Sequence, residues 1–257
     1  MDKPFDEFVV SKTILDSYYE KLHDSLECDV AIVGAGPSGL LLAGDLSRQG
    51  LKVVVIEAKL APGGGTWGGG MGMNQVVFQP EVSGILERIG LRSKKVGKVR
   101  TADAVELAAC LINYALRGGA TLLNLITAED VTVLADRVAG VVVNRTGISG
   151  RYHVDPIMVS SKVTVDATGH DARLVNFLNA HGYKIGTDSG VYMGEGAMDV
   201  VEGERFVVEN AGKLFDGLYV TGMAVCATYN GPRMGPIFGG MLMSAEKVGG
   251  LIMSELR

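Results

Sequence analysis

The chain has 257 residues, of which 47% are apolar and 21% are charged, and its formal net charge is −5. This composition is ordinary for a globular enzyme, and the length allows one sizeable core. The lysines and arginines are scattered rather than gathered into a basic stripe, so we expect no nucleic-acid partner. No apolar run reaches the roughly 18 residues needed to span a bilayer, so we expect no membrane segment.

The cysteines and the first residues indicate the compartment. Three cysteines lie far apart in the sequence, an odd number that argues against a disulfide framework. The first six residues are acidic and lack the pattern of a signal peptide. Because unpaired cysteines persist in a reducing environment, we expect a cytoplasmic protein.

The first predicted element is a helix. Apolar residues recur at helical spacing between positions 4 and 25, which predicts a helical arm within residues 1–25. Residues 28–58 then give the order strand, glycine-rich turn, helix, strand. The turn has the spacing Gly34-x-Gly36-x-x-Gly39, and the second strand ends in Glu57. This order predicts a dinucleotide site, with the pyrophosphate at the helix N-terminus and a ribose diol on the acid.

Later segments alternate between helical and strand periodicity after a glycine-rich loop at 61–70. We expect helices at 80–90, 102–117 and 239–256, and strands at 120–126, 130–134, 138–144, 162–169 and 218–222. The glycine-rich segment 182–196 is expected to be mobile. No linker separates independent domains, so residues 1–257 are expected to form one dinucleotide-binding domain, with its core in 28–75 and 160–257 and an insertion at 76–159.

The order of these elements predicts an α/β fold. Two late strands end in Ala-Thr-Gly and Val-Thr-Gly, which is typical of Rossmann-like, two-dinucleotide-binding folds of the flavoprotein type. The mostly parallel central sheet would carry an additional β-sheet subdomain and the N-terminal helical arm. Ligands in such sheets lie beyond the carboxyl ends of the strands. The residues expected to line the nucleotide are Gly34, Gly36, Ser38, Gly39, Glu57, Ala58, Gly65, Val131 (through its backbone) and Met223.

One position distinguishes between possible dinucleotides. Flavoproteins of this layout usually have an acidic residue directly after the final strand's glycine. Here Gly222 is followed by Met223, which weakens the case for FAD and favours NAD.

Three segments are more specific than the dinucleotide fingerprint. They are Ala61-Pro-Gly-Gly-Gly-Thr-Trp67, Asp166-Ala-Thr-Gly-His-Asp171 and Asn230-Gly-Pro-Arg-Met-Gly-Pro-Ile-Phe-Gly239. With them the sequence resembles the thiamine thiazole synthase family, in order and without large gaps, from about residue 25 to the C-terminus. The resemblance implies that NAD is a substrate: nicotinamide leaves, the ADP-ribose condenses with glycine, and sulfur is added to give an ADP-thiazole carboxylate. It also implies a homo-octamer.

The resemblance further implies a source of sulfur. Eukaryotic members of the family donate the sulfur of a cysteine that lies two residues before an Asp-Pro pair. Here the pair is Asp155-Pro156, and His153 occupies the donor position. Imidazole has no sulfur to give, so the chain resembles the archaeal branch that uses free sulfide and turns over repeatedly. His153 itself could be a proton shuttle, part of the sulfide site, or a spacer.

Family resemblance also assigns the catalytic side chains. Asp155 and His170 are the expected metal ligands, because a carboxylate and an imidazole suit a borderline ion such as Fe(II). With His153 they form the expected catalytic set. Arg233, in a loop stiffened by glycine and proline, is expected to bind the carboxylate of glycine. Two alternatives remain: an FAD-dependent oxidoreductase of the same fold, and a non-catalytic NAD-binding sensor.

Overall fold

A mixed eight-stranded β-sheet forms the centre of the molecule in the computed structural model, which describes residues 5–187 and 194–257. Five of its strands run parallel to one another, in the order β11-β9-β1-β2-β6. Strand β10 pairs antiparallel with β11 at one edge. The bounds are β1 Glu27–Val33, β2 Val53–Glu57, β6 Thr121–Asn124, β9 Ile157–Asp166, β10 Gly212–Phe215 and β11 Leu218–Val220.

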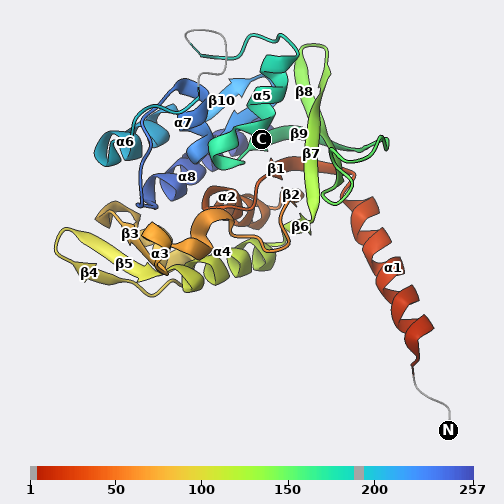
Figure 1. Ribbon diagram of the computed structural model, residues 1–257, viewed down its shortest axis with the longest axis horizontal. Coiled ribbons are helices and arrows are strands. Elements are labelled where there is room, and N and C mark those ends of the chain that lie inside the picture. Colours follow the sequence, from red (N-terminus) through yellow and green to blue (C-terminus); the bar gives the residue numbers. More distant parts are fainter. Residues whose placement is uncertain (1–4, 188–193) are drawn as a thin grey trace.

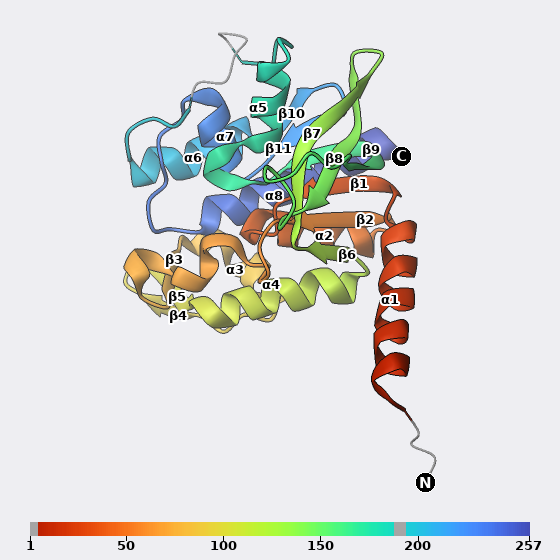
Figure 2. The same cartoon turned by 45° about the vertical axis from the view of Figure 1, so that its right-hand side comes forward.

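Strand β9 joins two parts of this sheet. Its first residues pair antiparallel with β8 (Arg137–Arg145), which in turn pairs with β7 (Ile126–Leu134). Its last residues pair with β11, while β1 follows its other edge. In Figure 2 the β7–β8 ribbon rises above β1 and β2, whereas α2 (Pro37–Arg48) and α4 (Ala104–Gly118) lie beneath them. Strands β1 and β2 are therefore covered on both faces, which explains the apolar runs Val30–Val33 and Val53–Ile56.

The remaining elements complete the layers. A separate antiparallel sheet has the order β3-β5-β4. No helix of the described residues is long and apolar enough to cross a membrane. The elements not yet bounded are α3 Ser83–Arg88, β3 Gln75–Phe78, β4 Lys94–Val96, β5 Val99–Asp103, α5 Arg173–Ala180, α6 Val200–Asn210, α7 Met223–Tyr229 and α8 Gly239–Leu256.

Most elements expected from the sequence are present, and the fold class is confirmed. The strands expected at 130–134 and 162–169 are longer than expected, since β7 begins at Ile126 and β9 at Ile157. The sheet β3-β5-β4 and the helices α5, α6 and α7 were not predicted from the sequence. The strands of this sheet and α7 are short, whereas α5 and α6 have apolar residues at helical spacing that the sequence analysis did not use. Part of the 182–196 segment, residues 188–193, lies outside the described residues.

Helix α1 (Glu7–Asp24) confirms the expected arm, and it packs differently from every other long helix. None of its residues is buried, and Figures 1 and 2 show it projecting away from the body of the molecule. Near its C-terminal end, Lys21 Nζ donates to the Leu122 carbonyl oxygen at 2.7 Å. The large apolar side chains that it exposes include Phe8, Ile14, Leu15 and Tyr19.

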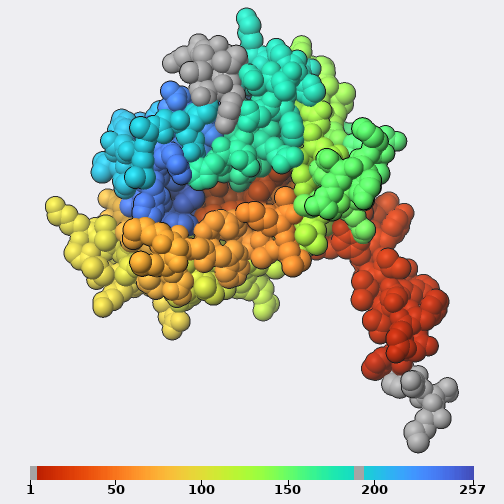
Figure 3. Space-filling model, viewed as in Figure 1, coloured from red at the N-terminus to blue at the C-terminus, as the bar shows by residue number. Residues whose placement is uncertain are grey.

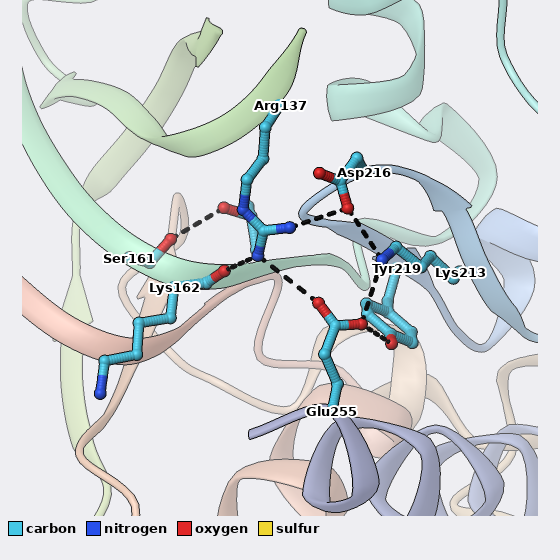
Figure 4. Close-up of polar contacts among 8 residues, drawn as sticks. Arg137, Ser161, Lys162, Lys213, Asp216, Tyr219 and Glu255 are labelled. Atoms are coloured by element: carbon cyan, nitrogen blue, oxygen red, sulfur yellow. Dashed lines mark hydrogen bonds and ion pairs between the residues drawn. The ribbon is translucent and has the colours of Figure 1, made fainter. Parts of the chain in front are cut away.

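A polar network links the C-terminal helix α8 to the sheet, and Figure 4 shows its contacts. The Arg137 guanidinium, at the start of β8, binds Asp216 at 2.8 Å and reaches Glu255 of α8 at 3.5 Å. Glu255 also accepts a 2.5 Å hydrogen bond from the Tyr219 hydroxyl. Burial, followed by this hydrogen bond to Glu255, raises the pKa of the Tyr219 hydroxyl, so Tyr219 acts as a donor here. We infer that this network stabilises the packing of α8 against the sheet.

Candidate active site

A cavity of about 540 Å³ opens beyond the carboxyl ends of the parallel strands. In the space-filling view the segment around the glycine turn is recessed between the orange 60–80 segment and the teal 165–185 segment (Figure 3). Its volume falls within the usual range for small-molecule and cofactor sites, roughly 300–1,000 Å³. The predicted residues that the cavity brings together are Gly34, Gly36, Ser38, Glu57, Ala58, Gly65, His170, Met223 and Arg233.

The glycine turn after β1 is shaped for close approach of a ligand. Gly34 has φ +104°, and a Cβ there would lie 2.3 Å from the Ala167 carbonyl oxygen. A Cβ on Gly39 would lie 2.0 Å from the Gly34 carbonyl oxygen, so Gly39 allows α2 to pack against the turn rather than lining the cavity. A Cβ on Gly36 would meet no atom within 4 Å, because this glycine faces open space. A phosphate can therefore reach the first N–H groups of α2.

Glu57 lies at the edge of this turn, as the fingerprint predicts. Its carboxylate accepts hydrogen bonds from Ala35 N at 2.9 Å and from Lys59 N at 2.8 Å. The side chain is buried, although it lines the cavity. Glu57 thus holds the glycine turn and the chain after β2 together at the edge of the cavity.

The final strand approaches the same turn from the opposite side of β1. Gly222, which has φ +65°, follows β11, and a Cβ there would lie 2.4 Å from Ser38 Oγ. Its N–H donates to Ser244 Oγ at 3.1 Å. Met223 then starts α7 and lines the cavity with a thioether in place of a carboxylate.

Asp166 builds the loop that carries His170. Its Oδ1 accepts from Thr168 N and Thr168 Oγ1, and its Oδ2 accepts from Leu174 N and Val175 N at the start of α5. The carboxyl group is fully buried, and this burial raises its pKa despite the four donors. Asp166 therefore fixes both ends of the segment in which His170 lies, so it acts as a structural residue of the site.

The Arg233 loop is held on both sides. Arg233 N donates to the Ala197 carbonyl oxygen at 3.2 Å, and Asp199 N donates to the Arg233 carbonyl oxygen at 3.1 Å. Cys226 Sγ lies 3.1 Å from the Pro232 carbonyl oxygen, to which it donates. Desolvation by burial raises the pKa of the Cys226 thiol to about 12, which makes this cysteine a packing residue rather than a nucleophile.

Glu195, which the sequence did not predict as a site residue, connects His170 and Arg233 through its carboxylate. Glu195 Oε1 lies 2.5 Å from His170 Nδ1, and Glu195 Oε2 lies 3.2 Å from Arg233 Nε. Glu195 is 25 residues from His170 in sequence, within a glycine-rich segment that has no periodicity. No sequence signal could have placed it there.

Asp155 and His153 are not part of this cavity in a single chain. Both are exposed in the loop before β9, whereas His170 follows β9. The Val154 carbonyl oxygen accepts from Asn144 Nδ2 of β8, which ties this loop to the β7–β8 ribbon. Because His170 lines the cavity and Asp155 does not, a single chain does not bring the expected pair together there.

A second prediction is corrected in β7. Val131 does not line the cavity, because it lies in the middle of the strand and its N–H donates to Asp130 Oδ1 at 2.8 Å. The first residues of β7, from Ile126 to Ala128, line the cavity in its place. The strand begins four residues earlier than expected, so its cavity-facing end also shifts toward the N-terminus.

Comparison with known proteins identifies the family. The sequence model of the Thi4 family matches residues 11–238. The chain belongs to the Thi4 family. It is 44% identical over 255 residues to the thiamine thiazole synthase of Thermotoga maritima, covering 97% of this chain and 98% of that one. It is also 44% identical over 252 residues to the enzyme of the same name from Pyrococcus abyssi, with coverage of 97% and 98%.

A solved Thi4 structure has the same architecture. The crystal structure of Thermovibrio ammonificans THI4 superposes with a TM-score of 0.95 at 40% identity, covering 98% of this chain and 99% of that chain. Because the match extends over nearly the whole length of both chains, the shared fold includes α1 and the β3-β5-β4 sheet as well as the central sheet.

Proposed function

We propose that the chain is a thiamine thiazole synthase that converts NAD, glycine and free sulfide into an ADP-thiazole carboxylate and releases nicotinamide. The observation that carries the proposal is one continuous cavity. It joins a dinucleotide cradle, made by the turn after Gly34 and by Glu57, to a polar cluster in which Glu195 bridges the cavity-lining residues His170 and Arg233. A plain nucleotide-binding module would not need the second part.

The order of the strands orients NAD in this cavity. The glycine turn after β1 receives the pyrophosphate, and Glu57 after β2 receives the adenosine ribose. The other ribose then points across β1 toward the loops after β9 and β11. Those loops carry His170 and Met223, so the carbon that loses nicotinamide lies at the polar cluster.

Arg233 is the proposed anchor for glycine. Its side chain is 55% exposed and lines the cavity, while its backbone is held on both sides. A guanidinium can bind a carboxylate through two parallel N–H donors, which fixes the direction of the bound molecule. Glycine held in this way presents its amine toward the ADP-ribose rather than toward solvent.

The metal proposal needs two copies of the chain. No group of three or more His, Cys, Asp or Glu residues that could hold a metal lies within residues 5–187 and 194–257. His170 fits Fe(II), because the hydrogen bond of Nδ1 leaves Nε2 as the ligating nitrogen. Asp155, exposed at the surface, can join His170 when a second copy supplies it. Fe(II) held there would supply a Lewis acid and open positions for sulfide.

The sulfur donor is proposed to be free sulfide. His153 has no sulfur, and neither Cys28, Cys110 nor Cys226 lines the cavity. Burial raises the pKa of the Cys28 thiol to about 12, as it does for Cys226. Since the thiolate is the reactive form, this burial disfavours both cysteines as sulfur donors. The enzyme would consequently turn over repeatedly.

The assembly is proposed to be a homo-oligomer, and an octamer is the expected form. Helix α1 projects from the body with large apolar side chains exposed along it, among them Phe8 at 73% and Leu15 at 67%. Exposed apolar surface of this extent marks an interaction site.

The experiment that tests the function is incubation of the purified protein with NAD, glycine, sulfide and Fe(II), followed by mass spectrometry of the small molecules. An ADP-thiazole carboxylate and nicotinamide are the expected products. Recovery of unchanged NAD would indicate a binding protein, and a flavin absorption band in the purified protein would indicate an oxidoreductase. Either result would overturn the proposal.

A further inference from the structure

We propose that Glu195 is a positioning residue that fixes the tautomer of His170 and the orientation of Arg233 at the same time. The inference deepens the proposed function and rests on it for the roles of these two partners. Glu195 spans them with its two oxygens, Oε1 at 2.5 Å from His170 Nδ1 and Oε2 at 3.2 Å from Arg233 Nε.

The bridge is built into the fold. The Glu195 side chain is 15% exposed, whereas those of His170 and Arg233 are 56% and 55% exposed. The residues that follow Glu195 pair with the Arg233 loop through the backbone, since Gly196 N donates to the Gly231 carbonyl oxygen at 2.9 Å and Met198 forms a bridge with Arg233. The main chain after Glu195 is thus fixed to the Arg233 loop, and this backbone contact holds the Glu195 side chain next to His170 and Arg233.

A carboxylate is the side-chain group that suits both partners. Arg233 Nε is always a donor, so Oε2 must accept. When Oε1 also accepts, His170 carries its proton on Nδ1 and keeps the lone pair of Nε2 for a metal. An amide in place of the carboxylate has one acceptor and one donor. Its NH₂ group would face either the guanidinium, which is unfavourable, or Nδ1, which favours the wrong tautomer.

The same bond decides how Arg233 can receive a substrate. With Glu195 on Nε, the two terminal nitrogens of the guanidinium form the edge that accepts a carboxylate in the bidentate manner. Loss of the bond would let the guanidinium rotate, so the bound glycine would lose its fixed direction.

The test compares Glu195→Gln with Glu209→Gln in the full-length protein. Glu209 is the matched control, because its carboxylate binds Arg205 on the exposed side of α6. The first measurement is the ¹⁵N spectrum of the imidazoles in metal-free protein at a pH where they are neutral, with the His170 signals assigned by their loss in His170→Gln. The second is titration with Co(II), followed by its visible absorption.

Wild-type protein and the Glu209→Gln control should show the Nδ1–H tautomer of His170. Glu195→Gln should shift it toward Nε2–H and weaken Co(II) binding by roughly 10–100-fold. It should also raise the KM for glycine more than it lowers kcat. An Nε2–H tautomer in the wild type, or unchanged tautomer and Co(II) affinity in Glu195→Gln, would overturn the inference.

These readouts separate the inference from the proposed function. If wild-type protein binds no Co(II) and makes no thiazole, the function fails, while the tautomer of His170 still tests Glu195. If Glu195→Gln does not fold, the wild-type spectrum alone decides, because the bridge requires the proton on Nδ1.

Discussion

Replacing Asp166 with Asn should lower the free energy of unfolding substantially, although the two side chains have nearly the same shape. The carboxylate accepts four hydrogen bonds, at 3.0 and 2.7 Å from Thr168 and at 2.8 and 3.2 Å from Leu174 N and Val175 N. Asn turns one acceptor oxygen into a donor, so two of the four bonds are lost. Each hydrogen bond to a charged group contributes about 1.5–3 kcal/mol.

The neutral Asn side chain offsets part of this loss of stability, because burial disfavours the charged form of Asp166 and raises its pKa. We therefore expect the free energy of unfolding to fall by about 2–4 kcal/mol, and the melting temperature by roughly 5–15 °C. Calorimetry at matched protein concentration measures both. Asp136→Asn is the control, since this turn residue has φ +58° and asparagine tolerates that conformation. A change of less than about 1 kcal/mol in Asp166→Asn would refute the reasoning.

Three further predictions concern the site. Glu57→Gln should weaken NAD binding by about 1–3 kcal/mol, because a charge-assisted ribose contact becomes neutral; unchanged affinity in a calorimetric titration would remove Glu57 from the site. Arg233→Lys should raise the glycine concentration required while leaving NAD cleavage largely intact, since lysine lacks the planar fork; normal use of glycine would exclude Arg233 as the clamp. Asp155→Ala and His170→Ala should each be inactive, and co-expressed mixed oligomers should regain part of the activity. Mixed oligomers that stay inactive would contradict a site shared between copies.

The part of the cavity proposed to bind the nucleotide was predictable from the sequence because its contacts are local. The turn from Gly34 to Gly39 and the acid Glu57 belong to one βαβ unit, and short-range backbone geometry fixes them. The fingerprint has glycine at both positions for physical reasons: Gly34 has a positive φ, and Gly39 allows α2 to pack closely against the turn.

The catalytic half was predictable in its residue types but not in its arrangement. Glu195 meets His170 and Arg233 only after β9, β11 and α6 have packed, and no spacing in the chain encodes that meeting. Asp155 precedes β9 and His170 follows it, and the proposed metal site pairs them across two copies of the chain, which no spacing within one chain encodes. The prediction for Val131 was wrong because the strand was expected to start at residue 130, whereas β7 starts at Ile126. The cavity lies at the N-terminal end of β7.

Stoichiometry of turnover tests the central claim most directly. Purified protein, loaded with Fe(II) and supplied with NAD, glycine and sulfide, should form more than one equivalent of ADP-thiazole carboxylate per chain. Its intact mass should be unchanged afterwards, since no cysteine of the chain reaches the cavity to give its sulfur. Product that stops at one equivalent per chain, with loss of one sulfur traced to Cys226 or another cysteine, would contradict the account.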